Sequence, residues 1–305
     1  MVAEGRVIRL ALAGDTMLGR GVARAIGRSR KPPLAPEVVA VAAEADLFVL
    51  NLECCISDRG QRWRDPAKPF FFRAPPLAAE LLAEVGVDCV TLANNHALDY
   101  GPQALLDTFD HLCAAGVAWV GAGADAAAAR APRVLAARGM RLAVLGASDH
   151  PATYAAGADR CGIAYADLHQ HQHASGGWLS RAVLAARGAA DAVLVTPHWG
   201  ANMTLRPPSY VRRAAHALLA AGATLVAGHS AHVVHGAERR VVYDLGDFVD
   251  DYAVDPRMRN DLGLLFLVEL DVRGPRRLEA VPLKLDYCRT RLARDEDAGW
   301  IRRRF

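Results

Sequence analysis

The chain has 305 residues, with 36 basic and 33 acidic side chains and a net charge of +3 at pH 7. Hydrophobic residues make up 52% and charged residues 23%, which excludes a disordered chain, and the balanced charge argues against a nucleic-acid partner. No apolar run reaches the ~18 residues of a membrane-spanning helix, and the first residues lack the apolar core of a signal peptide. We therefore expect a soluble, cytoplasmic protein with no membrane partner.

Short apolar runs of strand length alternate along the chain with Ala- and Leu-rich stretches of helical length. Because the runs are continuously apolar, they predict strands that are covered on both faces. Most of the helical stretches begin at or just after a proline, and several end near a glycine, as helices commonly do. After residue 240 the pattern favours strands joined by short links. The predicted strands are 7–13, 47–52, 89–93, 142–145, 192–195, 224–227, 241–243 and 264–270, and the predicted helices are 36–45, 75–85, 102–115, 179–187 and 208–221.

This alternation predicts a single compound α/β domain over residues 1–305, since the sequence contains no repeat and no linker. The arginine-rich segment from about residue 289 is predicted to be a solvated tail, with a docking surface for an acidic partner as the alternative. The six cysteines lack metal-binding spacing, so reduced and mostly buried thiols are expected. The alternating His and Gln run 169–173 is interpreted as a solvated loop.

Five of the predicted strands end directly in a polar cluster, at 14–20, 51–53, 94–99, 198–200 and 228–232. The carboxyl ends of strands in an open α/β sheet share one rim, so these clusters should converge there. Carboxylate and amide oxygens suit Mg, Mn or Ca, and imidazole adds Zn or Fe, so the clusters predict a divalent-metal site. The alternative is that each Asp or Asn caps the following helix and each His bonds a buried backbone group.

The clusters have the sequences GDTMLGR at 14–20, NLE at 51–53, ANNHALDYG at 93–101, HWG at 198–200 and GHSAHVVHG at 228–236. Together they resemble the CapA-like branch of the calcineurin-like metallophosphoesterase superfamily, which is named for poly-γ-glutamate capsule synthesis. The resemblance extends over roughly residues 10–250. It implies a four-layer α/β/β/α sandwich with a metal site at the carboxyl ends of the strands.

The resemblance also implies roles for individual residues. One or two divalent ions (Ca, Mn, Mg or Fe) are expected, and no organic cofactor, because the GAGADA segment 121–126 lacks the acidic residue of a dinucleotide site. His96 is expected to assist the substrate or leaving group, and Asp99 to orient His96. The predicted metal ligands are Asp15, Glu53, Asn95, His198 and His229. The predicted catalytic residues are His96, Asp99, Arg20, His232 and Asp247. The residues predicted to contact substrate are Asn94, Trp199, Tyr100, Phe72 and Arg73.

Four positions, in three motifs, depart from the expected patterns and decide the main functional hypothesis. Met17 replaces an imidazole ligand of the superfamily, and Asn51 and Glu53 occupy the motif where a bridging Asp is usual. Asp247 stands where CapA-like proteins usually carry Asn, so it could pair with a histidine of the 228–232 cluster. A second His–Asp pair beside His96–Asp99 would allow one base to remove a Cα proton and the other to return it from the opposite face.

The main hypothesis is therefore a metal-dependent peptide epimerase that inverts the C-terminal residue of a ribosomal precursor peptide, as a CapA-like protein beside lasso-peptide genes does. The first alternative is a metal-dependent hydrolase of phosphoester or γ-glutamyl amide bonds. The second is a factor in poly-γ-glutamate capsule synthesis. The sequence leaves the oligomeric state open.

Overall fold

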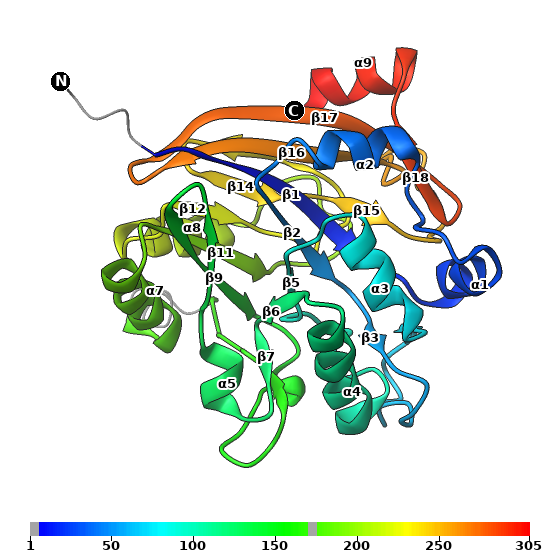
Figure 1. Cartoon of the computed structure of the whole chain (residues 1–305), viewed down its shortest axis with the longest axis horizontal. Helices are drawn as coiled ribbons and strands as arrows, with labels where there is room; N and C mark the ends of the chain where they lie inside the picture. The colour runs from blue at the N-terminus through cyan, green and yellow to red at the C-terminus, as the bar shows by residue number, and fades with distance from the viewer. Residues whose placement is uncertain (1–5, 170–175) are drawn as a thin grey trace.

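The computed structural model describes residues 6–169 and 176–305 and contains two large β-sheets between groups of helices (Figure 1). Residues 170–173 of the predicted His and Gln loop lie outside this part of the chain. Apolar side chains fill the space between the two sheets and the space between each sheet and its helices. The chain therefore has the four-layer α/β/β/α arrangement that the family resemblance implies.

The first sheet has the order β18-β17-β16-β1-β2-β5-β6, and β15 also pairs with β1. Strands β1, β2, β5, β6 and β15 run parallel, whereas β16, β17 and β18 form an antiparallel meander. The strands are β1 (Ile8–Thr16), β2 (Leu47–Leu52), β5 (Cys89–Thr91), β6 (Ala118–Val120), β15 (Asp247–Val249), β16 (Leu262–Asp271), β17 (Gly274–Asp286) and β18 (Arg289–Leu292).

The second sheet has the order β13-β14-β12-β11-β9-β8, with parallel central strands and antiparallel strands at both edges. Two small two-stranded sheets, β3 with β4 and β7 with β10, lie outside the large ones. The remaining strands are β3 (Cys55–Ile56), β4 (Arg73–Ala74), β7 (Ala122–Gly123), β8 (Arg133–Ala137), β9 (Met140–Ser148), β10 (Gly162–Ile163), β11 (Ala192–His198), β12 (Leu225–Ala227), β13 (His235–Glu238) and β14 (Val241–Asp244).

Helices cover the outer face of each sheet: residues of α1 to α4 pack on the first sheet, and residues of α7 and α8 on the second. None of the helices in the described residues is long and apolar enough to cross a bilayer. The helices are α1 (Arg20–Ser29), α2 (Pro36–Ala42), α3 (Leu77–Glu84), α4 (Gly101–Ala114), α5 (Ala126–Arg130), the 3-10 helix Ala152–Tyr154, α7 (Trp178–Ala189), α8 (Ser209–Ala220) and α9 (Asp295–Arg304).

The continuous apolar character of the strands follows from this layering. In β1, Leu10 and Leu12 belong to the core between the sheets, whereas Ala11 and Ala13 belong to the core under the helices. Successive side chains of a strand point to opposite faces, so a strand buried on both sides needs apolar residues at every position.

Each predicted strand and helix is present, and the structure adds elements that were not predicted, among them β6, α5 and β8 in the middle of the chain. Helix α1, which directly follows the first polar cluster, was not predicted. The arginine-rich segment from residue 289 is not a solvated tail: it forms β18 and α9, and Ile301 of α9 is buried in the core between the sheets. The described cysteines are free thiols, and four of the six are buried, as predicted.

Candidate metal centre

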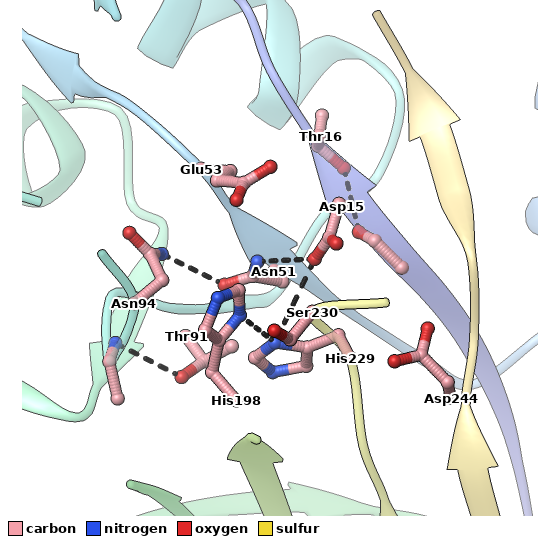
Figure 2. Close-up of polar contacts among 12 residues, drawn as sticks. Asp15, Thr16, Asn51, Glu53, Thr91, Asn94, His198, His229, Ser230 and Asp244 are labelled. Carbon is pink, nitrogen blue, oxygen red and sulfur yellow. Dashed lines mark hydrogen bonds and ion pairs between the residues drawn. The ribbon is translucent and has the colours of Figure 1, made fainter. Parts of the chain in front are cut away.

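Polar side chains from both sheets meet at the carboxyl ends of the strands (Figure 2). Asp15 lies at the end of β1, Glu53 follows β2, His198 ends β11, and His229 follows β12. A backbone bridge pairs His198 with His229 and brings the last two together. These four side chains are at most 1% exposed, so the site is buried at the junction of the sheets.

The end of β1 is positioned by its pairing with β15. Strand β16 pairs with β1 over Ile8–Leu12, and β15 pairs with it near the carboxyl end, where Asp247 lies opposite Asp15. The Asp15 backbone N–H donates to the Gly246 carbonyl at 2.9 Å, and a Cβ atom on Gly14 would lie 1.8 Å from the same oxygen. Glycine at position 14 therefore permits the approach that places the two carboxylates side by side.

A chain of amide hydrogen bonds orients Asp15. Asn51 Nδ2 donates to Asp15 Oδ1 at 2.7 Å, and Asn94 Nδ2 donates to Asn51 Oδ1 at 2.9 Å (Figure 2). Asn94 Oδ1 accepts from the His96 backbone N–H at 3.0 Å. Asn94 is fully buried with these partners and positions its neighbours, and its contact with substrate stays a prediction.

Two groups of buried side chains have the composition and spacing of a metal site, and both include Asp15. The donor atoms within each group lie within 4.8 Å of one another; one group is Asp15, His198 and His229, and the other is Asp15, Glu53 and His232. The atoms Asp15 Oδ2, Glu53 Oε1, Asn95 Oδ1 and His229 Nε2 are buried and lack a hydrogen-bond partner. Since buried polar atoms are normally satisfied, this donor set fits one or two divalent cations.

The electrostatics of these groups also favour a cation. Burial and the charge of Asp15 hold the pKa of Glu53 well above its usual range. Burial lowers the pKa of His198 well below the usual range and that of His229 to about 4. A divalent cation binds neutral imidazoles, and its charge would offset the burial and mutual repulsion that disfavour ionised Asp15 and Glu53 side by side.

His96 and Asp99 form the first predicted pair. His96 Nδ1 lies 2.6 Å from Asp99 Oδ2, and that carboxylate also accepts from the Phe72 backbone N–H at 2.6 Å. Lys68 Nζ lies 3.0 Å from Asp99 Oδ1. Burial lowers the pKa of His96 to about 4, even though Asp99 acts in the opposite direction. His96 is therefore a neutral, oriented imidazole near pH 7.

His232 and Asp247 form the second pair. His232 Nδ1 lies 2.8 Å from Asp247 Oδ1 and 3.2 Å from Asp15 Oδ2. Burial alone would lower the pKa of His232, but the surrounding carboxylates, Asp247 first, hold it well above the usual range. The backbone of His232 has a left-handed φ of 59°, which is uncommon outside glycine and is found at functional sites.

The other predicted residues lie around the His96 side of the site. Phe72 stacks on His96 with ring centroids 4.0 Å apart, and Arg73 lies over the Tyr100 ring at 4.2 Å. The Arg20 guanidinium pairs with Asp251 at 2.9 Å and lies 5.6 Å from the centre of the Phe72 ring, and its catalytic role stays a prediction. Trp199 is 2% exposed and donates to the Tyr243 carbonyl, so it packs against the strand ends, and its contact with substrate stays a prediction.

A third His–Asp pair, Asp149 and His150, was not predicted from the sequence. His150 Nδ1 lies 2.5 Å from Asp149 Oδ1, and the His150 ring lies 5.1 Å from that of His198. Both residues follow β9 directly, so the strand-end rule would have found them. Two further residues were not predicted. Tyr252 donates its hydroxyl to Glu53 Oε2 at 3.4 Å, and Lys68 pairs with Asp99. Neither residue follows a predicted strand end with a recognisable spacing.

Comparison with known proteins identifies the family. Residues 9–252, which contain every metal-site and histidine-pair residue described above, match the family described as bacterial capsule synthesis protein PGA_cap. The chain belongs to this family. Its CapA-like character, inferred from the strand-end motifs, is thereby confirmed.

Relatives cover most of this PGA_cap chain. A probable polyglutamine synthesis accessory protein of Mycobacterium tuberculosis is 30% identical, over 99% of this chain and 91% of its own length. The capsule biosynthesis protein CapA of Bacillus anthracis is 26% identical over 92% of this chain and 68% of its own length. The crystal structure of a hypothetical protein from Thermus thermophilus matches with a TM-score of 0.54 and 17% identity, over 91% of this chain and 99% of that one, which supports the fold alone.

Proposed function

We propose that this PGA_cap chain is a divalent-metal-dependent enzyme that acts on a glutamyl polymer or peptide during its synthesis. The observation that carries the proposal is the pair of buried donor groups that share Asp15, with Glu53 Oε1 left without a hydrogen-bond partner. The relatives named for capsule or polyglutamine synthesis suggest the class of substrate.

The chemistry of the site combines a base with an acid. A bound divalent cation would polarise a carbonyl or phosphoryl oxygen and lower the pKa of water. His96, whose pKa lies near 4, is neutral and able to accept a proton. His232, whose pKa is raised by the carboxylates around it, is charged and able to donate one. Groups whose pKa values are driven in opposite directions are suited to the base and acid roles of one reaction.

The reaction we favour is cleavage of a γ-glutamyl amide bond. In this reaction His232 protonates the leaving amine, and His96 binds the substrate beside Phe72 and takes the proton of the attacking water. Asp99 and Asp247 hold the two imidazoles in the required tautomers through their contacts at 2.6 and 2.8 Å. Phosphoester cleavage would use the same two residues.

A second candidate, Cα epimerisation of a peptide residue, is favoured by one specific observation. The two histidines have separate carboxylate partners, an arrangement that a hydrolase does not require. In this reaction His96 removes the Cα proton, and His232 delivers its own proton to the opposite face. The two histidines then exchange protons with solvent to restore the starting state, so no oxidant or further reactant is needed.

Mass spectrometry of peptides incubated in D2O distinguishes these reactions. The substrate pool contains γ-glutamyl oligomers, α-linked peptides varied at the C-terminus, and phosphorylated peptides, and the protein is loaded with Mn or Ca. Cleaved products without deuterium at Cα support the hydrolase. A gain of about one mass unit without cleavage supports the epimerase.

The His96→Gln variant provides the matched test, since it should retain the metal and the fold. We expect either activity to fall by about 10²–10⁴-fold, the usual contribution of a general acid or base. The control is His216→Gln, because His216 is an exposed histidine of α8 and should leave activity unchanged. Full activity of His96→Gln would contradict the role of His96, and full activity of chelator-treated protein would contradict the dependence on metal. No turnover of any member of the pool by the metal-loaded wild type would contradict the proposal and favour a non-catalytic assembly factor.

A further inference from the structure

We propose that a basic groove between α9 and the loops that carry the metal-site histidines binds an acidic peptide chain and presents it to the site. This inference rests on the proposed function, because it identifies the chemistry of the polymer that the site would process. The groove has a volume of about 490 Å³ and is lined by Arg206, Pro207, Val234, Trp300, Arg303 and Arg304, among others.

The groove concentrates positive charge without neutralising it. Three arginines line the groove and no acidic side chain does. The whole chain has an excess of only three basic over acidic residues, so three unbalanced positive charges in one groove are a strong local concentration. Within residues 6–169 and 176–305, Arg206, Arg303 and Arg304 have no carboxylate partner at ion-pair distance. An array of arginines without acidic partners attracts a chain with repeated carboxylates.

Helix α9 is built to present this charge. Its first turn carries Asp295, Glu296 and Asp297, and its last turn carries three arginines. The acidic end is held in the fold, because Asp297 accepts from Arg259 at 2.6 Å. The basic end projects exposed side chains into the groove, and the Arg304 guanidinium lies 5.4 Å from the centre of the Trp300 ring. Trp300 itself lines the groove and adds an apolar surface for the methylene groups of glutamyl side chains.

The wall opposite α9 is joined to the metal site. Arg206 lies in the loop after His198, and Val234 lies two residues after His232. The two loops are tied together by hydrogen bonds from the Met203 N–H to the Ala231 carbonyl at 2.9 Å and between His235 Nε2 and the Thr204 carbonyl at 2.7 Å. A polymer held in the groove would therefore rest on the loops that carry the site histidines.

Binding of a labelled γ-linked glutamate oligomer to the full chain, followed by fluorescence anisotropy at low and at physiological ionic strength, tests this inference. The Arg206→Glu/Arg303→Glu variant should raise the Kd by about tenfold or more at low ionic strength, because two attractive contacts become repulsive. Arg206→Gln/Arg303→Gln should show a smaller effect in the same direction. Arg24→Glu/Arg28→Glu, on the exposed side of α1, makes the same change in net charge and should bind like the wild type.

A third variant separates failure of the groove from failure of the proposed function. Asp15→Asn should lose turnover while retaining polymer binding, because the groove does not include the metal ligands. Unchanged binding in the Arg206→Glu/Arg303→Glu variant, or no binding by the wild type, would overturn the inference and leave turnover as the test of the proposed function. Tighter binding of single-stranded DNA than of the glutamate oligomer, lost in the same variant, would also overturn it by assigning the groove to a phosphate polymer.

Discussion

The Nδ1 atoms of His198 and His229 lie 2.7 Å apart at the carboxyl ends of neighbouring strands. Two lone pairs or two N–H groups at this distance would repel each other, so the pair must share either one proton or one cation. The pKa of both imidazoles is lowered, first of all by burial, and Asp15 Oδ1 lies 3.7 Å from His229 Nδ1. A cation held with the help of Asp15 would satisfy all three groups.

Asp15→Asn should abolish metal binding at both groups of donors, because Asp15 belongs to both. We expect metal affinity to fall by more than about tenfold, measured by metal analysis after dialysis against a metal buffer. Asp125→Asn is the matched control: Asp125 caps α5 by accepting from the Ala128 N–H, a role that Asn fills equally well. Wild-type metal content in Asp15→Asn would contradict this assignment.

Asn51→Asp should make the protein more dependent on metal. The substitution replaces the donor that faces Asp15 Oδ1 at 2.7 Å with a second carboxylate oxygen, so the two charges repel unless a cation lies between them. We expect a lower Tm than the wild type in chelator and a larger gain in Tm when Mn is added.

The control for this prediction is Asn260→Asp. Asn260 is a buried residue whose side-chain amide donates to the Ala253 carbonyl and accepts from the Asp255 N–H. Asn260 is distant in sequence from most of the metal-site residues. It should lower the Tm without any rescue by Mn. Equal Mn-dependent gains in Asn51→Asp and the wild type would show that position 51 does not face the cation.

Lys68→Met should move the pH dependence of the reaction. Lys68 contributes to the low pKa of His96, since its charge competes with His96 for Asp99. Without Lys68, the pKa of His96 should rise by about one unit, so the acid limb of kcat/KM should move to higher pH by a similar amount. Lys31→Met, at an exposed lysine, should leave the profile unchanged.

The low pKa of His96, to which Lys68 contributes, also determines how the stability of the fold changes with pH. The folded pKa of His96 is about 4 against an ordinary value of 6.5, so the unfolded chain binds the extra proton between these values. The free energy of unfolding should therefore decrease as the pH falls through this window. In Lys68→Met the contribution of His96 to this decrease should be smaller, and a steeper decrease would contradict the assignment.

Asp247→Asn should destabilise the chelator-treated protein in a pH-dependent way. The carboxylates around His232 raise its folded pKa above 6.5, so their stabilisation is complete below pH 6.5 and is lost as the pH rises through the folded pKa. We expect a loss of about 1–3 kcal/mol below that pH and a smaller loss above it, from urea unfolding. Asp286→Asn, which breaks an exposed pair with Arg291, should change little at any pH, and an equal loss for Asp247→Asn at every pH would contradict the pairing.

The sequence predicted the alternation of strands and helices well because the central strands are apolar at nearly every position. A strand such as β11 that is buried on both faces leaves a continuous run, and the proline before α2 and the glycine after α4 mark helix ends. Helix α1 escaped prediction because its arginine-rich sequence exposes most of its surface, and only Val22, Ile26 and Gly21 are buried.

The sequence by itself also determined that Asp15, Glu53, His198 and His229 would lie at one rim, because each lies at or just after the carboxyl end of a parallel strand, although Asp149, His150 and Tyr252 were not found. Only the tertiary structure decided how those residues divide their roles. The pairing of β15 with the end of β1 places Asp247 beside His232. Burial lowers the pKa of His96, whereas the surrounding carboxylates raise the pKa of His232. The local sequence pattern indicates which strands are buried and where they end. The pKa values and the groove beside α9 depend on charged side chains that lie far apart in the sequence and come together only when the sheets and α9 pack.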